Sequence, residues 1–114
     1  MLPESSQGCK TEYKGKFADT AVPALILEML KLGAVKSRLV AKITGGAQMF
    51  KFANTSELMS IGELNVKSVL EVLKKESIPV VFQDTGKTYG RSIRLCISTG
   101  QLYIKSIAHQ EKVV

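Results

Sequence analysis

The chain has 114 residues, of which 45% are hydrophobic and 23% are charged. This composition is typical of one folded globular domain and unlike that of a disordered chain. The longest apolar run is interrupted by Glu28 and Lys31, so it falls far short of the roughly 20 residues that a membrane helix needs. Residues 1–4 show no secretory signal. We therefore expect a single cytoplasmic domain over residues 1–114, with no membrane insertion.

The formal net charge is +6, but lysines and arginines are spread along the chain with acidic residues among them. Proteins that bind nucleic acids usually cluster these residues on one face. We therefore interpret the charge as a solvated surface, and we expect no nucleic acid among the partners. The two cysteines, Cys9 and Cys96, and the single His109 fit neither a zinc spacing nor a disulfide framework. No metal and no cofactor are expected.

The N-terminal segment divides into two parts. Residues 4–16 are polar, contain glycine and show no period, which predicts a surface loop. Residues 1–3 are two apolar residues followed by a proline, a pattern that resembles the end of a strand whose beginning is missing.

A first helix is predicted over residues 20–32, because apolar side chains recur there at helical spacing. Asp19 and Thr20 are candidates for the N-cap, and Pro23 suits a first turn, where its missing N–H is not needed. Gly33 can adopt the left-handed geometry of a C-terminal cap.

A strand, a helix and a strand follow in order. Residues 39–43 predict a buried strand ended by Gly45 and Gly46, residues 61–75 an amphipathic helix, and residues 78–82 a second buried strand. Between them, residues 49–60 are expected to form a loop that packs two phenylalanines. Consecutive strands joined by a helix pair in parallel through a right-handed crossover. This order predicts the α/β class.

The C-terminal part is predicted to hold a loop and an antiparallel hairpin. Residues 83–90 are polar, and residues 93–98 and 102–107 alternate between apolar and polar side chains across a turn at 98–100. The polar residues 109–112 are expected to be frayed.

Ordered motifs run through the chain: MLPES at 1–5, KFADTAVP at 16–23, EMLKLGA at 28–34, AKI with GGA and MF at 41–50, IGE with NV at 61–66, and DTG with GR at 84–91. In order and spacing they resemble the motifs of the CheD family. One departure is Lys87, where the family usually has the second glycine of its loop. This exchange leaves the conformation of the loop open.

The resemblance implies a layered α/β/β domain of the cysteine-hydrolase kind, with helices on one side of mixed sheets and with the N-terminal strands truncated. The implied activity is hydrolytic deamidation of specific glutamines to glutamates on methyl-accepting chemoreceptors. The implied partners are these receptors and a CheC-type phosphatase. Periodicity by itself supports only the α/β class.

The resemblance also implies that the catalytic residues are missing. In the family, the catalytic cysteine lies in a Gly-Ser-Cys turn near the N-terminus, and the catalytic histidine lies two residues ahead of the MLP motif. Since Met1 corresponds to the methionine of that motif, both would lie upstream of it. We therefore expect residues 1–114 to be the C-terminal portion of the family domain and to contain no catalytic residue.

Three residues could in principle replace the missing ones. Cys9 lies in a polar loop that would hold a nucleophile too loosely for productive geometry. Cys96 is expected mid-strand, where a small buried side chain is the common interpretation. His109 is expected in a solvated tail. None of them forms a credible pair of nucleophile and base.

Two loops have both a structural and a functional interpretation. The two glycines at 45–46 could cradle an anion, but no phosphate-binding motif is present, so we predict a tight turn. The loop 84–91 could be a connection or could grip a receptor helix. Two other functions stay open: a non-catalytic adaptor that binds a CheC-type phosphatase or receptors, and a small basic nucleic-acid-binding domain.

Overall fold

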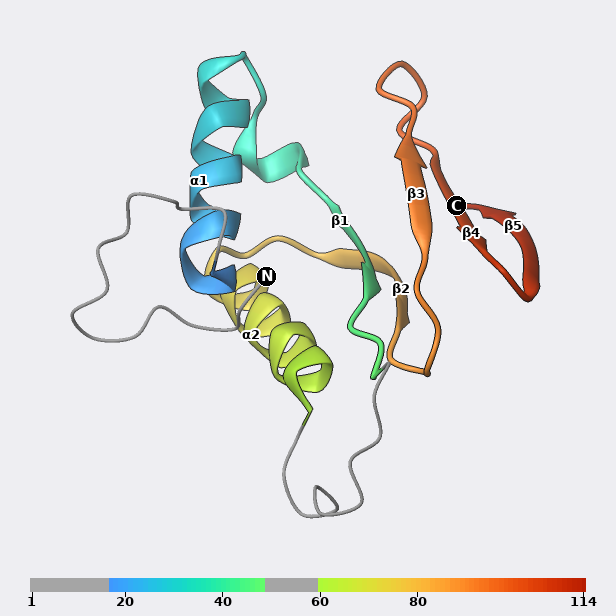
Figure 1. Ribbon diagram of the computed structural model, residues 1–114. Helices are drawn as coiled ribbons and strands as arrows, with labels where there is room; N and C mark the ends of the chain where they lie inside the picture. Colours follow the sequence, from blue (N-terminus) through green and yellow to red (C-terminus); the bar gives the residue numbers. More distant parts are fainter. Residues whose placement is uncertain (1–16, 49–59) are drawn as a thin grey trace.

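A computed structural model describes residues 17–48 and 60–114 (Figure 1). The predictions for residues 1–16, which include the strand end, the first loop and Cys9, lie outside this range, as does most of the loop 49–60. The described elements are α1 (Ala18–Lys31), a short 3-10 helix (Lys36–Arg38), β1 (Ala41–Gly45), α2 (Ile61–Lys75), β2 (Val80–Thr85), β3 (Ser92–Leu95), β4 (Leu102–Ser106) and β5 (His109–Val113).

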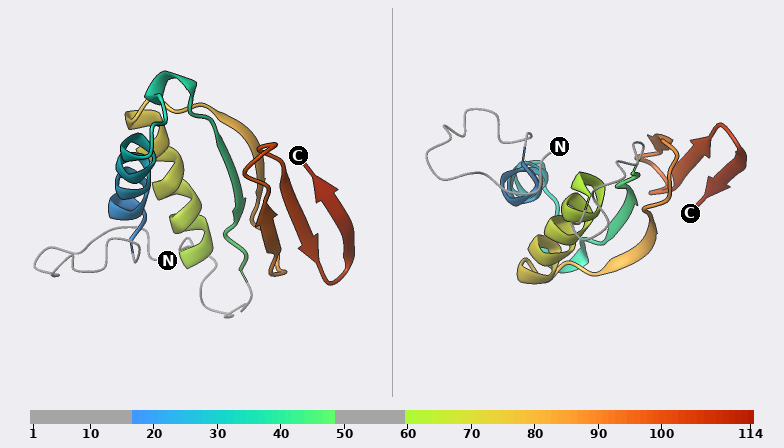
Figure 2. Two further views of the ribbon diagram at one scale, coloured as in Figure 1. Left: turned by 90° about the horizontal axis from the view of Figure 1, so that it is seen from above. Right: turned by 60° about the horizontal axis from the view of Figure 1, so that its bottom comes forward.

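The elements form three layers. β1 and β2 make a two-stranded parallel sheet, and β3, β4 and β5 make a three-stranded antiparallel sheet. Figure 2 shows α1 and α2 on one side of β1 and β2, with the antiparallel sheet on the other side. The predicted α/β class and the parallel crossover are confirmed. Parallel and antiparallel pairing both occur, each in its own sheet.

The core lies between the helices and the parallel sheet. Ile26 of α1, Leu73 of α2 and Ile78 ahead of β2 are each 6–7% exposed and pack together. Partly buried apolar residues of the helices and of β1 and β2 surround them. Burial of this kind is the main force that holds amphipathic helices on a sheet. The core therefore fixes α2 across β1 and β2.

The helix α2 has the predicted bounds, Ile61–Lys75. Its N-cap is Ser60, whose side-chain oxygen accepts a hydrogen bond of 3.2 Å from the backbone N–H of Glu63. The cap satisfies one of the free N–H groups of the first turn. The apolar period and the cap agree, and this explains why the prediction is correct at both ends.

The helix α1 is confirmed, but its predicted start is wrong. The helix begins at Ala18, its N-cap is Phe17, and no side chain caps it. Thr20 Oγ1 instead donates to the Phe17 carbonyl at 3.1 Å, and Pro23 lies inside the helix. Phe17 and Ala18 are both buried, so packing starts the helix earlier than the polar capping signal indicates.

The predicted bounds of β1 and β2 are shifted from those observed. The strands were expected at 39–43 and 78–82, but they occupy Ala41–Gly45 and Val80–Thr85. Leu39 and Ile78 belong to the core or pack against it without being in a strand. The polar residues at the end of β2 pair through their backbones with the end of β1. The apolar runs therefore predict which residues reach the core, but they do not predict which residues are paired in the strands.

The predicted C-terminal hairpin is confirmed, but the expected fraying of residues 109–112 is wrong. β3 pairs with β4, and His109–Val113 forms β5 on the other edge of β4. Leu102 and Val114 exchange two backbone hydrogen bonds of 2.8 and 3.0 Å. Backbone pairing does not require apolar side chains, and charged side chains are common on edge strands because they discourage further pairing.

Lys87 has a φ of 63°, in the left-handed region. The loop therefore keeps a glycine-like conformation although its residue departs from the family pattern. Replacing Lys87 with glycine is expected to raise the free energy of unfolding by about 0.5 to 1 kcal/mol, because a side chain is strained there. Urea denaturation measures the change. As a control, Lys67→Gly in α2 should destabilise by about 1 kcal/mol, and equal effects would contradict the expectation.

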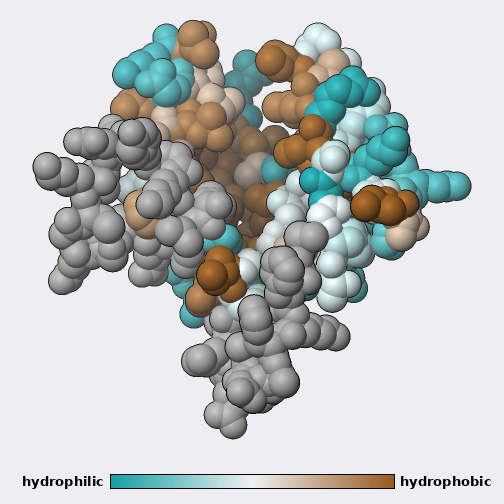
Figure 3. Space-filling model, in the orientation of Figure 1, coloured by the Kyte–Doolittle hydropathy of each residue, from teal (hydrophilic) through white to brown (hydrophobic). Residues whose placement is uncertain are grey.

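Apolar side chains remain exposed on α1 and on β3. Leu25 and Leu27 are 61% and 51% exposed, and Ile93 and Leu95 are 58% and 59% exposed. Figure 3 shows hydrophobic residues gathered in the hollow between these two elements. Large apolar patches and uncovered strand edges favour association. We expect Leu95→Lys to reduce concentration-dependent light scattering relative to Gln101→Lys, and equal scattering of the two variants would contradict this.

Candidate functional site

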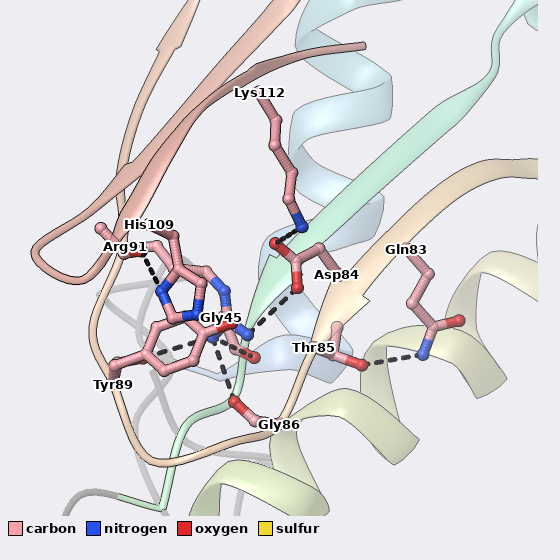
Figure 4. A network of polar contacts seen from close by, with 10 residues as sticks. Gly45, Gln83, Asp84, Thr85, Gly86, Tyr89, Arg91, His109 and Lys112 are labelled. Carbon is pink, nitrogen blue, oxygen red and sulfur yellow. Dashed lines mark hydrogen bonds and ion pairs between the residues drawn. The ribbon is translucent and has the colours of Figure 1, made fainter.

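A cluster of polar residues lies at the carboxyl ends of β1 and β2 (Figure 4). Its centre is Arg91, whose side chain is only 2% exposed and forms an ion pair of 3.2 Å with Asp84 Oδ1. Arg91 Nη1 also lies near three backbone carbonyl oxygens: Gly86 at 3.1 Å, Tyr89 at 3.4 Å and Gly45 at 3.5 Å. One guanidinium therefore connects the ends of both parallel strands.

The cluster extends to the antiparallel sheet through Tyr89. The Arg91 guanidinium lies 4.6 Å from the Tyr89 ring centre, and this ring stacks on His109 of β5 with centres 4.4 Å apart. His109 Nδ1 lies 3.0 Å from Ser106 Oγ. Lys112, also on β5, reaches Asp84 Oδ2 at 3.7 Å. His109 is thus exposed, as expected, but it lies in an ordered strand and not in a tail.

Burial of Arg91 gives this residue of the loop 84–91 a structural role. A side chain that grips a partner must reach the surface, whereas Arg91 points inward, and its Nη1 and Nη2 donors face groups of the same chain. A buried arginine needs a carboxylate and several acceptors to offset the loss of water. The Arg91 cluster therefore ties the two sheets together.

Gly45 is the last residue of β1 and Gly46 follows it, and no regular turn is formed at residues 46–48, where a tight turn was predicted. Gly45 and Gly46 have φ angles of 110° and 66°, a region that glycine adopts without strain. This segment is held from the neighbouring loop, since Gly86 N donates to the Gly45 carbonyl at 2.9 Å. A side-chain carbon on Gly46 would clash with Val66 and would lie 2.9 Å from the Gly62 carbonyl oxygen. The backbone of α2 at Gly62 is therefore in direct contact with the backbone at Gly46.

A groove of about 390 Å³ lies beside this contact. Residues of α2 between Glu63 and Glu71 form one side, and Gly46, Thr85 and Gly86 form the other side. The groove therefore opens at the carboxyl ends of parallel strands, where ligands of α/β proteins usually bind.

Cys96 is not a buried strand residue, so that prediction is wrong. It follows β3 at the start of the turn to β4 and is partly exposed. The Ser98 hydroxyl lies 3.3 Å from its sulfur. Hydrogen bonds from the side chains of Ser98 and then Thr99 lower the pKa of Cys96 to about 7. The turn residues stop the alternation that had indicated a longer strand.

The lowered pKa has a direct test. In a Cys9→Ser background, the alkylation of Cys96 by iodoacetamide is expected to rise with pH around a midpoint of about 7, because the thiolate is the reactive form. Ser98→Ala should move this midpoint up toward the ordinary value of 9.0, since the group that stabilises the thiolate is removed. An unchanged midpoint in Ser98→Ala would contradict this cause.

No pair of nucleophile and base is formed within residues 17–48 and 60–114. Cys96 bonds to Ser98, whereas His109 bonds to Ser106 and stacks on Tyr89, so no hydrogen bond joins the two. Cys9 lies outside the described residues.

The part of the chain that the structure describes also holds no group of side chains that could bind a metal ion. Neither α1 nor α2 is long and apolar enough to cross a membrane.

Comparison with known proteins identifies the family. A family model described as CheD chemotactic sensory transduction matches residues 1–106. The chain belongs to the CheD family. A protein named "Probable chemoreceptor glutamine deamidase CheD" from Caldanaerobacter subterraneus subsp. tengcongensis is 48% identical over 114 residues, which cover 100% of this chain and 70% of that protein. Proteins of the same name from Syntrophomonas wolfei and Lachnoclostridium phytofermentans are 48% and 43% identical, with 71% of each covered.

Within this CheD-family chain, the resemblance predicted from the motifs is confirmed, but the role of Arg91 was missed. Sequence alone placed Arg91 in a polar loop, since charged residues are rarely buried. Two signals pointed to the contact: Asp84 follows an apolar strand, and a glycine precedes Arg91. Only the fold shows that the arginine turns back toward Asp84.

Proposed function

We propose that this chain is part of a chemoreceptor glutamine deamidase, an enzyme that hydrolyses the side-chain amide of specific receptor glutamines to glutamate. The observation that carries the proposal is the match of the whole chain, at 48% identity, to relatives that bear this name. Neither the adaptor nor the nucleic-acid alternative is favoured by any feature of the described residues.

The proposed reaction needs a thiolate and a base. The thiolate attacks the amide carbonyl, ammonia leaves after taking a proton from a histidine, and water hydrolyses the thioester to give glutamate. Cys96 and His109 do not form such a pair, and we expect the polar sequence around Cys9 to hold a nucleophile too loosely for productive geometry. We therefore propose that the nucleophilic cysteine and the histidine lie outside residues 1–114. The chain covers 70% of the length of one such relative, which is compatible with this division.

The residues of this chain would then supply the scaffold and part of the substrate surface. The Arg91 cluster and the segment at 45–46 hold the carboxyl ends of β1 and β2 in place. We also propose that residues 1–114 form one domain, the C-terminal portion of the family domain. Its proposed location is the cytoplasm, and its proposed partners are methyl-accepting chemoreceptors and a CheC-type phosphatase.

The function is tested with the longest gene product, including any in-frame codons upstream of Met1. This protein is incubated with the cytoplasmic fragment of a chemoreceptor from the same genome, and tandem mass spectrometry locates glutamine-to-glutamate changes. We expect conversion at specific glutamines and its loss when the upstream cysteine is replaced with serine. Conversion that survives this replacement would refute the assigned chemistry, and no conversion at all would refute the proposed function.

A further inference from the structure

The groove beside α2 has an apolar floor that the core does not use. Val66 and Leu70 line it and are partly buried. The adjacent Val69 instead packs against the core of Ile26, Leu73 and Ile78, and neither Val66 nor Leu70 is part of that cluster. These two side chains therefore present apolar surface to the groove and not to the interior.

Three exposed charged residues of α2 also line the groove. Glu63, Lys67 and Glu71 follow one another at intervals of four residues, in the order acid, base, acid. Residues four apart lie on one face of a helix, and eight residues of helix rise about 12 Å. The groove thus offers an inclined row of alternating charge, about two helical turns long, next to an apolar floor.

The wall opposite α2 is small and rigid. It is formed by Gly46, Thr85 and Gly86, so few side-chain atoms stand between a bound partner and the backbone. The buried Arg91 guanidinium holds the carbonyl of Gly86, and Gly86 N donates to the Gly45 carbonyl. A fixed wall of small residues allows the helix of a partner to approach closely. Binding then does not have to pay the entropy cost of ordering a loop.

We propose that this groove binds one amphipathic helix of the receptor substrate, laid along α2. Apolar side chains of that helix would fill the groove over Val66 and Leu70. Charges in the order base, acid, base, four residues apart, would face Glu63, Lys67 and Glu71. Helix-in-groove recognition uses this combination of apolar anchors and flanking charges. The inference rests on the proposed function for the identity of the receptor, but the groove itself is independent of the catalytic residues.

The test measures binding by the 114-residue chain itself. The probe is a fluorescent peptide from a glutamine-containing cytoplasmic segment of a receptor encoded in the same genome, with the expected charge order, and the readout is anisotropy. Leu70→Trp fills the groove, and we expect it to weaken binding about tenfold or more, a loss of about 1.4 kcal/mol. Arg38→Trp places the same side chain at an exposed position that does not line the groove, and its binding should be unchanged.

A second variant guards against misfolding of Leu70→Trp. Lys67→Glu changes only an exposed side chain, and we expect it to weaken binding to the original peptide. A peptide whose central acid is replaced with lysine should restore binding, because the charge pair is then reversed. Equal binding by Leu70→Trp and Arg38→Trp, absence of this rescue, or no binding by the unaltered chain would overturn the inference.

The same variants separate this inference from the proposed function. If the longest gene product deamidates the receptor fragment and Leu70→Trp leaves its KM unchanged, the groove assignment is wrong and the function stands. If the chain binds the peptide through the groove but the longest gene product converts no glutamine, the groove stands and the deamidase function is wrong.

Discussion

Replacing Arg91 with alanine is expected to lower the free energy of unfolding by about 3 to 5 kcal/mol, because it leaves the largely buried Asp84 carboxylate without its main partner. The same change removes a donor from three backbone carbonyls at the ends of the parallel strands. Since small domains are stable by only about 5 to 15 kcal/mol, the variant should be marginally folded. Urea denaturation followed by circular dichroism measures the loss.

Arg94→Ala is the matched control for Arg91. Arg94 is exposed on β3 and stacks on Tyr103 at 3.9 Å, an interaction expected to contribute about 0.5 to 1 kcal/mol. Should Arg91→Ala prove insoluble, Asp84→Asn removes the charge of the same pair and keeps its shape. Losses in Arg91→Ala and Asp84→Asn no larger than in Arg94→Ala would show that the cluster does not hold the sheets together.

Gly62→Ala is expected to destabilise the protein by about 1 to 3 kcal/mol through overpacking. The same change within a helix is normally favourable by up to about 1 kcal/mol, so the expected sign is reversed. The added carbon would clash with the Gly46 carbonyl, lying 2.7 Å from its carbon and 2.8 Å from the Ala47 oxygen. These nearest atoms all belong to the backbone, which cannot rotate away as a side chain can. Thermal unfolding measures the difference.

Gly33→Ala provides the comparison for Gly62→Ala. Gly33 has a φ of 103° and nothing lies within 4 Å of an added carbon, so only backbone strain of about 1 kcal/mol is expected. A stabilised Gly62→Ala protein would contradict the close contact between α2 and the segment after β1.

The parts of the fold that could be predicted have a regular spacing of apolar residues or a sequence typical of a turn. The helix α2 repeats its apolar residues over four turns and begins at a capping serine, and the β3–β4 hairpin alternates on both sides of a turn that contains Gly100. β5 was missed because its ladder is made by backbone groups beneath exposed, charged side chains. Its partner β4 ends only two residues earlier, at Ser106, but the connecting Ile107 and Ala108 are not the glycine, asparagine or aspartate that usually signal a two-residue hairpin turn.

Features of the site that follow from the residue type could be predicted from the sequence. Features that follow from burial or from contacts between distant segments could not. The two glycines at 45–46 predicted where β1 ends and where the backbone takes positive φ angles, because glycine adopts these angles freely. Cys96 was placed in a strand because the alternation runs past the last paired residue, Leu95. The groove beside α2 could not be predicted, since its walls come from segments distant in sequence that meet only after folding.

The central claim is that these 114 residues supply a scaffold and a substrate surface, while the nucleophile and base of the deamidase lie elsewhere. The most direct test is tandem mass spectrometry of a receptor cytoplasmic fragment incubated with the 114-residue chain alone, beside the longest gene product. We predict no glutamine-to-glutamate conversion by the short chain during the time in which the longer product completes the reaction. Conversion by the short chain, abolished by Cys9→Ser or Cys96→Ser, would contradict the claim.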